Sequence, residues 1–345
     1  MPLAKCLPPL LVSIFLGSSS MTLLIRTVAI RAGIIDHPSD RSSHTIPTPR
    51  GGGIAIVAAA NIGFLILWVS GYFSTSLLLA LLAGLAIALI GFIDDRRSIS
   101  SVSRLMVHFA VAALAIVAIG GMPSIRVGSH LLQPGLGLSL LGVFAVVWTT
   151  NLFNFMDGID GVAASEAIFI LCAACVLSLR FGSSTNLGVS ELVLAAAILG
   201  FLIWNWPPAR IFMGDVGSGY LGYSIAVLAL ASGYENPVLP YVWITLGGVF
   251  FVDATVTLGR RLLRLERIDQ AHRTHAYQWV ARSWRSHGRV TLAVVAIDVI
   301  WLLPCAWLEL SIPGYAARLT GLAMVPLAII ALWAGAGRSE STPTS

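Results

Sequence analysis

The chain has 345 residues, of which 57% are hydrophobic and only 11% are charged, and its formal net charge is +5. Soluble domains carry about 25% charged residues, so this composition excludes an ordinary water-soluble enzyme. It also excludes a disordered chain, which would be poor in hydrophobic residues. Four cysteines are too few for a chain of this length to be a small domain held together by disulfide bonds. The sequence therefore predicts an integral membrane protein.

Apolar stretches of membrane-spanning length follow one another along almost the whole chain. A transmembrane helix needs about 20 apolar residues, and eleven stretches approach this length. They lie near Leu10–Ile30, Gly51–Gly71, Leu77–Ile93, Leu105–Gly121, Leu138–Phe153, Val162–Phe181, Leu192–Trp206, Gly217–Ser232, Val238–Leu258, Val290–Leu308 and Tyr315–Trp333. Because a helix satisfies its own backbone hydrogen bonds in lipid, we predict one domain over residues 1–345. Its expected fold is an all-α, polytopic bundle of about eleven transmembrane helices.

The basic residues predict how this bundle is oriented. Lys and Arg gather in loops on the cytoplasmic side. With the N-terminus outside and the C-terminus inside, 17 of the 21 basic residues lie on that side. Lys5 and Leu10–Leu16 also resemble a signal peptide, but the apolar run resumes at Met21 and favours an uncleaved first span. In the long outer loop at Pro123–Gly137, we expect a small hairpin at Ser124–Val127.

Polar residues are concentrated in the cytoplasmic loops of this topology. These loops lie at about residues 31–50, 94–104, 154–161, 207–216 and 260–289. Loops between helices that are distant in sequence can meet at one face of a bundle. We therefore predict that the five loops form one site at the cytoplasmic ends of the helices.

Five aspartates in these loops are candidates for catalysis and metal binding. Asp94 and Asp95 are adjacent, Asp157 and Asp160 are three residues apart, and Asp215 precedes the eighth stretch. If their segment is helical, Asp157 and Asp160 lie on one face. Carboxylates close to lipid are costly and usually functional, and several together need a cation between them. Mg²⁺, with Mn²⁺ as an alternative, suits such oxygen ligands; the other interpretation is that the aspartates are solvated loop ends.

Arg50 and the last loop are candidates for binding an anionic substrate. Arg50 is followed by Gly51–Gly53 at the start of a helix, where exposed amides and the helix dipole would attract an anion. A flexible hinge is the alternative. The last loop contains His272, Arg273 and His275 beside aromatic residues, which suits a phosphorylated substrate with a ring. An amphipathic helix that only anchors the loop at the membrane surface is the other interpretation.

Together these motifs resemble the polyprenyl-phosphate N-acetylhexosamine-1-phosphate transferases, which move a sugar-1-phosphate from a UDP-sugar onto a lipid phosphate. The resemblance extends from about Asp36 to Gln278 and keeps the order of the motifs. Its most specific part is Asn151–Gly161 followed by Met213–Ser218. The segment His272–Gln278 is similar to the branch that starts O-antigen or related surface glycans, rather than to the peptidoglycan-precursor branch.

The resemblance implies a role for each matched residue. Asp94 and Asp95 are expected to handle the metal or the lipid phosphate, and Asp215 is expected to bind Mg²⁺. The remaining implied roles are nucleotide and catalytic contacts for Asn151, Asn154 and Asp157, and sugar-phosphate binding for His272 and His275.

We therefore predict transfer of N-acetylhexosamine-1-phosphate (N-acetylglucosamine or a 6-deoxy relative) to undecaprenyl phosphate at a bacterial inner membrane, with release of UMP. Asp215 would hold the metal with Asp157 or Asp160, and Asp94 or Asp95 would prepare the lipid phosphate for attack. The expected partners are the UDP-sugar, the polyprenyl phosphate and the lipid bilayer; a homodimer is left open, and nucleic acid is not expected. The alternative is a secondary transporter, whose binding groups would lie near mid-membrane on broken helices.

Overall fold

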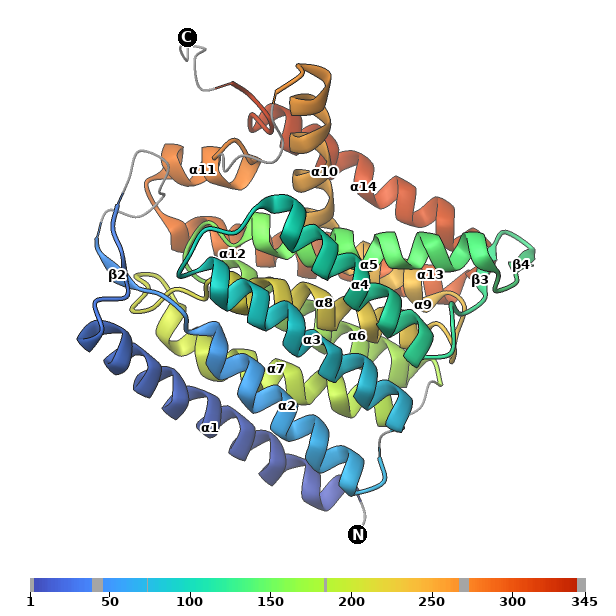
Figure 1. Ribbon diagram of the computed structural model, residues 1–345. Helices are drawn as coiled ribbons and strands as arrows, with labels where there is room; N and C mark the ends of the chain where they lie inside the picture. Colours follow the sequence, from blue (N-terminus) through green and yellow to red (C-terminus); the bar gives the residue numbers. More distant parts are fainter. Residues whose placement is uncertain (1–2, 39–45, 73, 183–184, 267–272, 340–345) are drawn as a thin grey trace.

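The computed structural model describes residues 3–38, 46–72, 74–182, 185–266 and 273–339. Within them the chain is mainly helical, with two short antiparallel sheets (Figure 1). The elements are α1 (Leu3–Arg31), β1 (Ile35–Asp36), β2 (Thr48–Pro49), α2 (Gly53–Val69), α3 (Thr75–Asp94), α4 (Ser101–Ala118), β3 (Ile125–Val127), β4 (His130–Leu132), α5 (Leu136–Met156), α6 (Val162–Arg180), α7 (Thr185–Asn205), α8 (Asp215–Ser232), α9 (Leu239–Leu246), α10 (Gly248–Leu263), α11 (Ala276–Trp284), α12 (His287–Ile297), η1 (Asp298–Leu302), α13 (Leu303–Ser311), η2 (Pro313–Tyr315) and α14 (Ala316–Trp333). The all-α prediction is confirmed.

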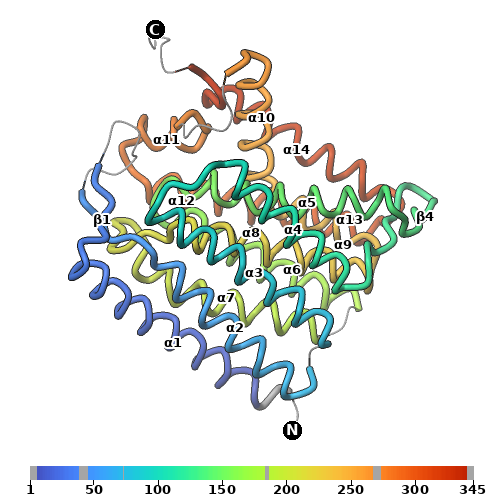
Figure 2. The backbone as a smooth tube through the Cα atoms, in the orientation of Figure 1, coloured from blue at the N-terminus to red at the C-terminus, as the bar shows by residue number. Residues whose placement is uncertain are grey.

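Most of the long helices lie side by side between two ends of the molecule (Figure 2). At one end lie β1, β2 and α11, and we call this the site end. At the opposite end β3 pairs with β4 to form a short hairpin, at the position where the sequence predicted one. Helix α10 runs across the direction of the other helices (Figure 1).

The surface of the bundle is apolar, as expected for a protein surrounded by lipid. Large side chains such as Leu114 and Val117 on α4 are 61% and 76% exposed. Contiguous apolar surfaces of this kind are rare on soluble monomers. By length and composition, eight of the described helices are suited to cross a membrane, or nine if α9 and α10 count as one bent span. The protein is therefore a multi-pass membrane protein.

All eleven predicted apolar stretches are helical, but they are not eleven equal spans. Helix α2 has only 17 residues. The ninth stretch breaks at Gly247, where α9 and α10 meet at an angle of 71°; glycine favours such a break because it stabilises a continuous helix poorly. The tenth stretch contains the π-helical turn Asp298–Leu302.

Helix α8 forms the centre of the bundle, packed against α2, α3 and α5. Two of its tyrosines are fully buried. The Tyr220 hydroxyl accepts a hydrogen bond from Asn61 Nδ2 at 2.9 Å, and the Tyr223 hydroxyl donates to the Ala80 carbonyl oxygen at 2.5 Å. Buried polar groups are costly unless they are hydrogen-bonded. These bonds therefore hold α8, which begins with Asp215, in register with α2 and α3.

Glycines let three helices meet at the site end. A Cβ on Gly53 would lie 2.4 Å from the Gly217 Cα, and one on Gly91 would lie 2.5 Å from the Asp215 carbonyl oxygen. Both distances are too short for any side chain, so only glycine permits these approaches. The starts of α2 and α8 and the end of α3 are thereby brought together around Asp215.

Candidate active site

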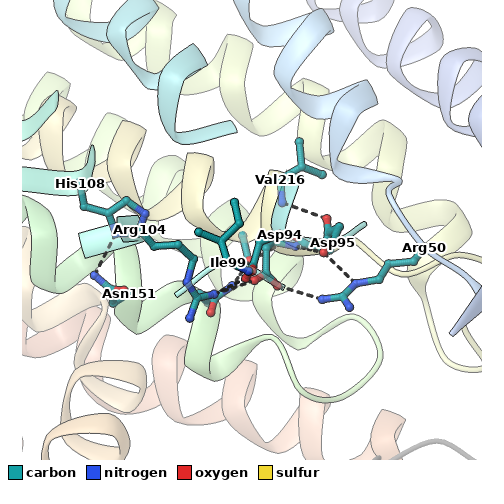
Figure 3. A network of polar contacts seen from close by, with 12 residues as sticks. Arg50, Asp94, Asp95, Ile99, Arg104, His108, Asn151 and Val216 are labelled. Atoms are coloured by element: carbon teal, nitrogen blue, oxygen red, sulfur yellow. Dashed lines mark hydrogen bonds and ion pairs between the residues drawn. The ribbon is translucent and has the colours of Figure 1, made fainter. Parts of the chain in front are cut away.

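Three aspartates and two arginines form an ion-pair network at the site end (Figure 3). Arg50 Nε lies 2.9 Å from Asp95 Oδ1, and Arg50 Nη2 lies 2.9 Å from Asp215 Oδ1. Arg104 Nη1 bonds to Asp94 Oδ2 and lies 3.2 Å from Asp215 Oδ2. We call these five residues the carboxylate cluster. It joins the segment before α2, the end of α3 and the starts of α4 and α8.

Asp95 holds the first residues of α8 in place. Its Oδ1 accepts the Asp215 N–H at 3.0 Å, and its Oδ2 accepts the Val216 N–H at 3.3 Å. A carboxylate suits this position because the first amides of a helix lack acceptors within the helix. The preceding residue, Gly214, has a φ of 78°, and a Cβ there would lie 2.5 Å from Asp95 Oδ2. Asp95 thus orients Asp215.

Backbone pairing explains the position of Arg50. The Phe212 N–H donates to the Pro49 carbonyl oxygen at 2.8 Å, and the amides of Gly51–Gly53 donate to the carbonyl oxygens of Phe212 and Met213. The predicted anion site made of exposed glycine amides is therefore wrong, because these amides already have acceptors. What remains of that prediction is the Arg50 side chain, which is directed at two carboxylates of the cluster (Figure 3).

Asn151 and Asn154 extend the cluster along α5. Asn154 Nδ2 donates to Ser218 Oγ at 3.1 Å, and Asn151 Nδ2 lies 3.2 Å from His108 Nδ1 (Figure 3). Both asparagines, His108 and Arg104 line a cavity of about 20 Å³ next to Asp215. Sequence reasoning did not single out His108 or Arg104. Their spacing of four residues on one helix, which places both on the same face, was the available signal.

Asp157 and Asp160 do not share a helical face. Helix α5 ends at Met156, and both aspartates lie in the loop that follows, so the helical arrangement is wrong. Asp157 lies close enough to Arg50 for the two charges to interact. Asp160 has other partners: its Oδ1 is 3.2 Å from His287 Nδ1, and its Oδ2 accepts the Ala209 N–H at 3.0 Å.

Burial controls the protonation of the cluster. It raises the pKa of Asp215 to about 6, although the Arg50 charge opposes the increase. Burial likewise raises the pKa of Asp95, again against Arg50. The pKa of Asp157 lies well above its usual value for the same reason. A charge removed from water is disfavoured unless an opposite charge is near, so these carboxyl groups need cations.

The donor set has the chemistry that Mg²⁺ requires. Carboxylate and amide oxygens are its preferred protein ligands, and the cluster supplies them from several helices. In the part of the chain that the structure describes, no three His, Cys, Asp or Glu side chains already converge as a metal centre. The guanidinium groups of Arg50 and Arg104 lie between the carboxylates instead. The residues fit the ion once an arginine gives up one of its carboxylate partners.

The histidine-bearing loop leads into α11, which contacts the end of α5 through Tyr277. His272 lies outside the described residues. The Arg273 carbonyl oxygen accepts a hydrogen bond from Arg282 Nη1 at 3.0 Å. His275 is 1% exposed, caps the N-terminus of α11, and has its Nδ1 3.3 Å from Asp253 Oδ1. A direct contact of His275 with substrate stays a prediction, because in this structure the side chain supports the loop.

Asp253 anchors α11, a role that sequence reasoning did not assign. Its carboxylate accepts the N–H groups of Ala276 and Tyr277 at 2.9 and 3.0 Å, and the Thr257 hydroxyl at 3.0 Å. An acid inside an apolar stretch was the signal available. The Tyr277 hydroxyl in turn donates to the Phe155 carbonyl oxygen at 3.0 Å. Asp253 and Tyr277 therefore connect α10 with the loop that carries Asp157.

Two larger cavities lie close to these residues. A polar pocket of about 710 Å³ is lined by Asp160, Pro207, Phe212, Arg282, Arg285 and His287, among others. An apolar groove of about 540 Å³ lies between α5, α8 and the bent pair α9 and α10. The groove extends from Met122 near the hairpin to Leu152 and Phe153 near the site end.

Residues 77–233 match the sequence model of the family described as glycosyl transferase family 4. A Bacillus subtilis protein named as a probable undecaprenyl-phosphate N-acetylglucosaminyl 1-phosphate transferase is 32% identical over 287 residues. The alignment covers 81% of this chain and 79% of that protein. The chain belongs to glycosyl transferase family 4. Its matched region contains Asp94, Asp95, Asp157, Asp160 and Asp215, whereas Arg50, Asp253 and α11 lie outside it.

Further relatives are similar over most of their length. A Mycolicibacterium smegmatis protein named as a decaprenyl-phosphate N-acetylglucosaminephosphotransferase is 28% identical, with 89% of this chain and 83% of that protein covered. A Moorella thermoacetica protein named as a phospho-N-acetylmuramoyl-pentapeptide-transferase is 30% identical, with 85% and 93% covered. These relatives are named as transferases, so they do not support the transporter alternative.

Proposed function

We propose that this member of glycosyl transferase family 4 transfers an N-acetylhexosamine-1-phosphate from a UDP-sugar to undecaprenyl phosphate and releases UMP. The observation that carries the proposal is that the end of α5 and the loop after it border all three features. Leu152 and Phe153 line the apolar groove, Asn154 lines the small cavity beside Asp215, and Asp160 lines the polar pocket. The relatives named as undecaprenyl- and decaprenyl-phosphate N-acetylglucosamine transferases support it.

The polar pocket suits the nucleotide part of the donor. Phe212 offers an aromatic face and Asp160 an acceptor for a ring N–H or a ribose hydroxyl, while Arg282 and Arg285 supply positive charge for a diphosphate. Phe212 is also two residues from Gly214, which leads into α8 and Asp215. A donor in this pocket would therefore extend its diphosphate towards the carboxylate cluster.

The apolar groove suits the polyprenyl chain of the acceptor. It is lined almost wholly by aliphatic and aromatic side chains, which match an isoprenoid in polarity and can hold it by van der Waals packing. Its end at Leu152 and Phe153 adjoins Asn151 and Asn154. A lipid in the groove would thus present its phosphate to the cluster without leaving the membrane.

The reaction needs two phosphates held in line. An oxygen of the lipid phosphate forms a bond to the sugar-linked phosphorus of the donor, the bond from that phosphorus to the bridging oxygen breaks, and UMP leaves. A phosphate monoester has a second pKa near 6, so the nucleophile needs little help from a base. Asp94 Oδ1 accepts the Ile99 N–H, and its Oδ2 pairs with Arg104. Of the candidate bases, Asp94 is the better placed, because its Oδ2 is released once Arg104 binds a phosphate, whereas Asp95 holds the start of α8.

The arginines and Asp215 are the groups suited to the transferred charge. Asp215 and Asp157 would hold Mg²⁺, which supplies charge neutralisation of the diphosphate when bound. Arg50 and Arg104 then become available to bind phosphate oxygens, which match the fork of a guanidinium. The Asp215 carboxylate positions both arginines in the free enzyme.

The loops support a proposal for the location and for the branch of the family. Eleven helical segments across the bacterial inner membrane, with the N-terminus outside and the C-terminus inside, would place the site end in the cytoplasm, where 17 of the 21 basic residues then lie. The segment from His272 to Gln278 favours a surface-glycan role such as O-antigen initiation over peptidoglycan-precursor synthesis. The proposed donor sugar is N-acetylglucosamine or one of its 6-deoxy relatives.

Membranes that contain the protein provide the test. They should convert UDP-N-acetylglucosamine, or a UDP-linked 6-deoxy relative, and undecaprenyl phosphate into labelled glycolipid with one UMP per transfer. The reaction should stop when EDTA removes divalent cations and resume with Mg²⁺ or Mn²⁺. Formation of glycolipid without UMP, or none from any of these donors, would contradict the proposal.

A further inference from the structure

The residues that follow α14 form a tight turn, which we call the C-terminal turn (residues 334–337). Gly335 and Gly337 have φ angles of 94° and 64°, which favour glycine, and Ala336 between them is fully buried. A Cβ at position 335 would lie 3.4 Å from Trp279 Cδ1 of α11. One at position 337 would lie 2.9 Å from the Thr257 carbonyl oxygen of α10. The turn therefore fits between α10 and α11.

Three hydrogen bonds hold the C-terminal turn. Arg260 Nη1 and Arg264 Nη1 donate to the carbonyl oxygens of Ala336 and Gly337 at 2.8 and 2.7 Å. The Gly337 N–H donates to the Thr274 carbonyl oxygen at 2.7 Å. Two bonds thus come from the end of α10, and the third holds the residue before the N-cap of α11. The turn ties the histidine-bearing loop to α10.

The path from Thr274 to the site is short. Helix α11 begins at Ala276, and its Tyr277 hydroxyl donates to the Phe155 carbonyl oxygen, two residues before Asp157. A Cβ on Gly158 would lie 2.2 Å from Tyr277 Oη, so the loop and the helix are in close contact. The C-terminal part of α11 contributes Arg282 to the polar pocket. A displacement of the loop at residue 274 would therefore reach both the loop that carries Asp157 and the polar pocket.

We propose that the C-terminal turn is a positioning element for sugar transfer, which clamps the 273–278 loop and α11 against the loop that carries Asp157. The inference rests on the proposed function. The turn contacts no substrate, so it acts through Thr274 and Tyr277. Because α11 borders the polar pocket and not the apolar groove, the turn governs use of the sugar nucleotide and not use of the lipid.

The test compares two glycine substitutions in the full-length chain, one in the C-terminal turn and one within α14. Gly337→Ala forces a side chain against Thr257 and Arg260, whereas a Cβ on Gly321 of α14 meets open space, so Gly321→Ala is the control. With UDP-N-acetylglucosamine and undecaprenyl phosphate, Gly337→Ala should raise the KM for the nucleotide sugar about tenfold or more. The KM for the lipid should change less than about twofold, within experimental scatter.

Two further measurements separate positioning from folding and from the proposed function. Hydrogen exchange of the amides of residues 274–278 needs no turnover and should be faster in Gly337→Ala than in Gly321→Ala. In a double-mutant cycle, Tyr277→Phe removes the link to Phe155, so Gly337→Ala should cost less in that background. Three results would overturn the inference: hydrogen exchange that is the same in both variants, an equal rise in KM for both substrates, or fully additive effects of Gly337→Ala and Tyr277→Phe on transfer. Transfer by the wild type in the same assay tests the proposed function separately.

Discussion

Asp215 is bound on each oxygen by a different arginine, and Asp95 fixes its backbone. The position is partly buried, so the negative charge is stabilised mainly by Arg50 and Arg104. A carboxylate held in this way is preorganised to accept a cation or to release an arginine to a phosphate. No other aspartate in the described part of the chain contacts both arginines. For this reason Asp215 is the residue whose loss should affect the chemistry most.

Asp215→Asn should reduce Mg²⁺-dependent release of UMP by about a hundredfold or more, because the neutral amide keeps the shape but not the charge that binds a cation. The variant should still insert into the membrane and fold, since Asn occupies nearly the same volume. Rates of UMP release in purified, detergent-solubilised enzyme are the measurement. Glu235→Gln, just beyond the opposite end of α8, is the control. Normal turnover in Asp215→Asn would remove Asp215 from the metal site.

The raised pKa of Asp215 makes a second prediction, for stability. Burial raises this pKa to about 6 in the folded protein, above its ordinary value of 3.8. The folded state thus binds the proton more tightly than the unfolded state, so the stabilisation is complete below about pH 4 and is lost as pH rises through about 6. In metal-free enzyme, the melting temperature of wild type should therefore fall relative to Asp215→Asn by a few degrees between about pH 5 and pH 7. A difference that does not vary with pH would contradict this assignment.

Helix α11 shows how a secondary-structure element is positioned by one buried carboxylate. The helix has nine residues, which is too short to be stable alone. The Asp253 carboxylate accepts hydrogen bonds from two of its first amides and lies 3.3 Å from His275 Nδ1. The element therefore depends on α10 for its start and on Phe155 for its orientation.

Asp253→Ala should loosen α11 and lower transfer activity, because the Ala276 and Tyr277 amides would be left buried without acceptors at about 1–3 kcal/mol each. Faster hydrogen exchange at residues 276–280 and a lower melting temperature are the expected readouts. Thr257→Val removes only one donor to the same carboxylate and should have a much smaller effect. Equal effects of the two variants would show that Asp253 does not carry the anchoring.

The whole molecule combines an apolar groove along the helical bundle with a polar pocket and the carboxylate cluster at its site end. The bend of 71° between α9 and α10 helps to form the groove, because it moves α10 away from the direction of α5 and α8 (Figure 1). The polar pocket is lined by Asp160 of the loop that follows α5, whereas the groove is lined by Leu152 and Phe153 of α5 itself. A lipid substrate and a water-soluble one can therefore approach the same cluster from different environments.

A bulky residue in the groove should interfere with the lipid and not with the nucleotide sugar. Ala229→Trp fills part of the groove lining and should raise the KM for undecaprenyl phosphate about fivefold or more, with little change in the KM for the UDP-sugar. The effect should be smaller for a short prenyl phosphate, whose chain does not reach Ala229. Leu79→Trp, on an exposed face of α3, is the control. A rise in the KM for the UDP-sugar alone would argue against a lipid in the groove.

The sequence by itself determined the class of the protein and the position of nearly every helix. Composition and run length are local properties, and each apolar stretch forms a helix because lipid leaves the backbone no other donors and acceptors. The loops that carry Asp94, Asp157 and Asp215 were likewise recognisable from clustered polar residues between apolar stretches. The family resemblance depended on the same local motifs.

Only the tertiary structure decided which of these side chains meet. Asp157 and Asp160 are close in sequence, yet Asp157 feels the charge of Arg50 and Asp160 pairs with His287, because α5 ends at Met156 and both residues lie in the loop that follows. The Gly51–Gly53 amides looked exposed until residues 212 and 213 paired with them. Such contacts join residues more than 100 positions apart, and they depend on which helices are neighbours. No local periodicity contains that information.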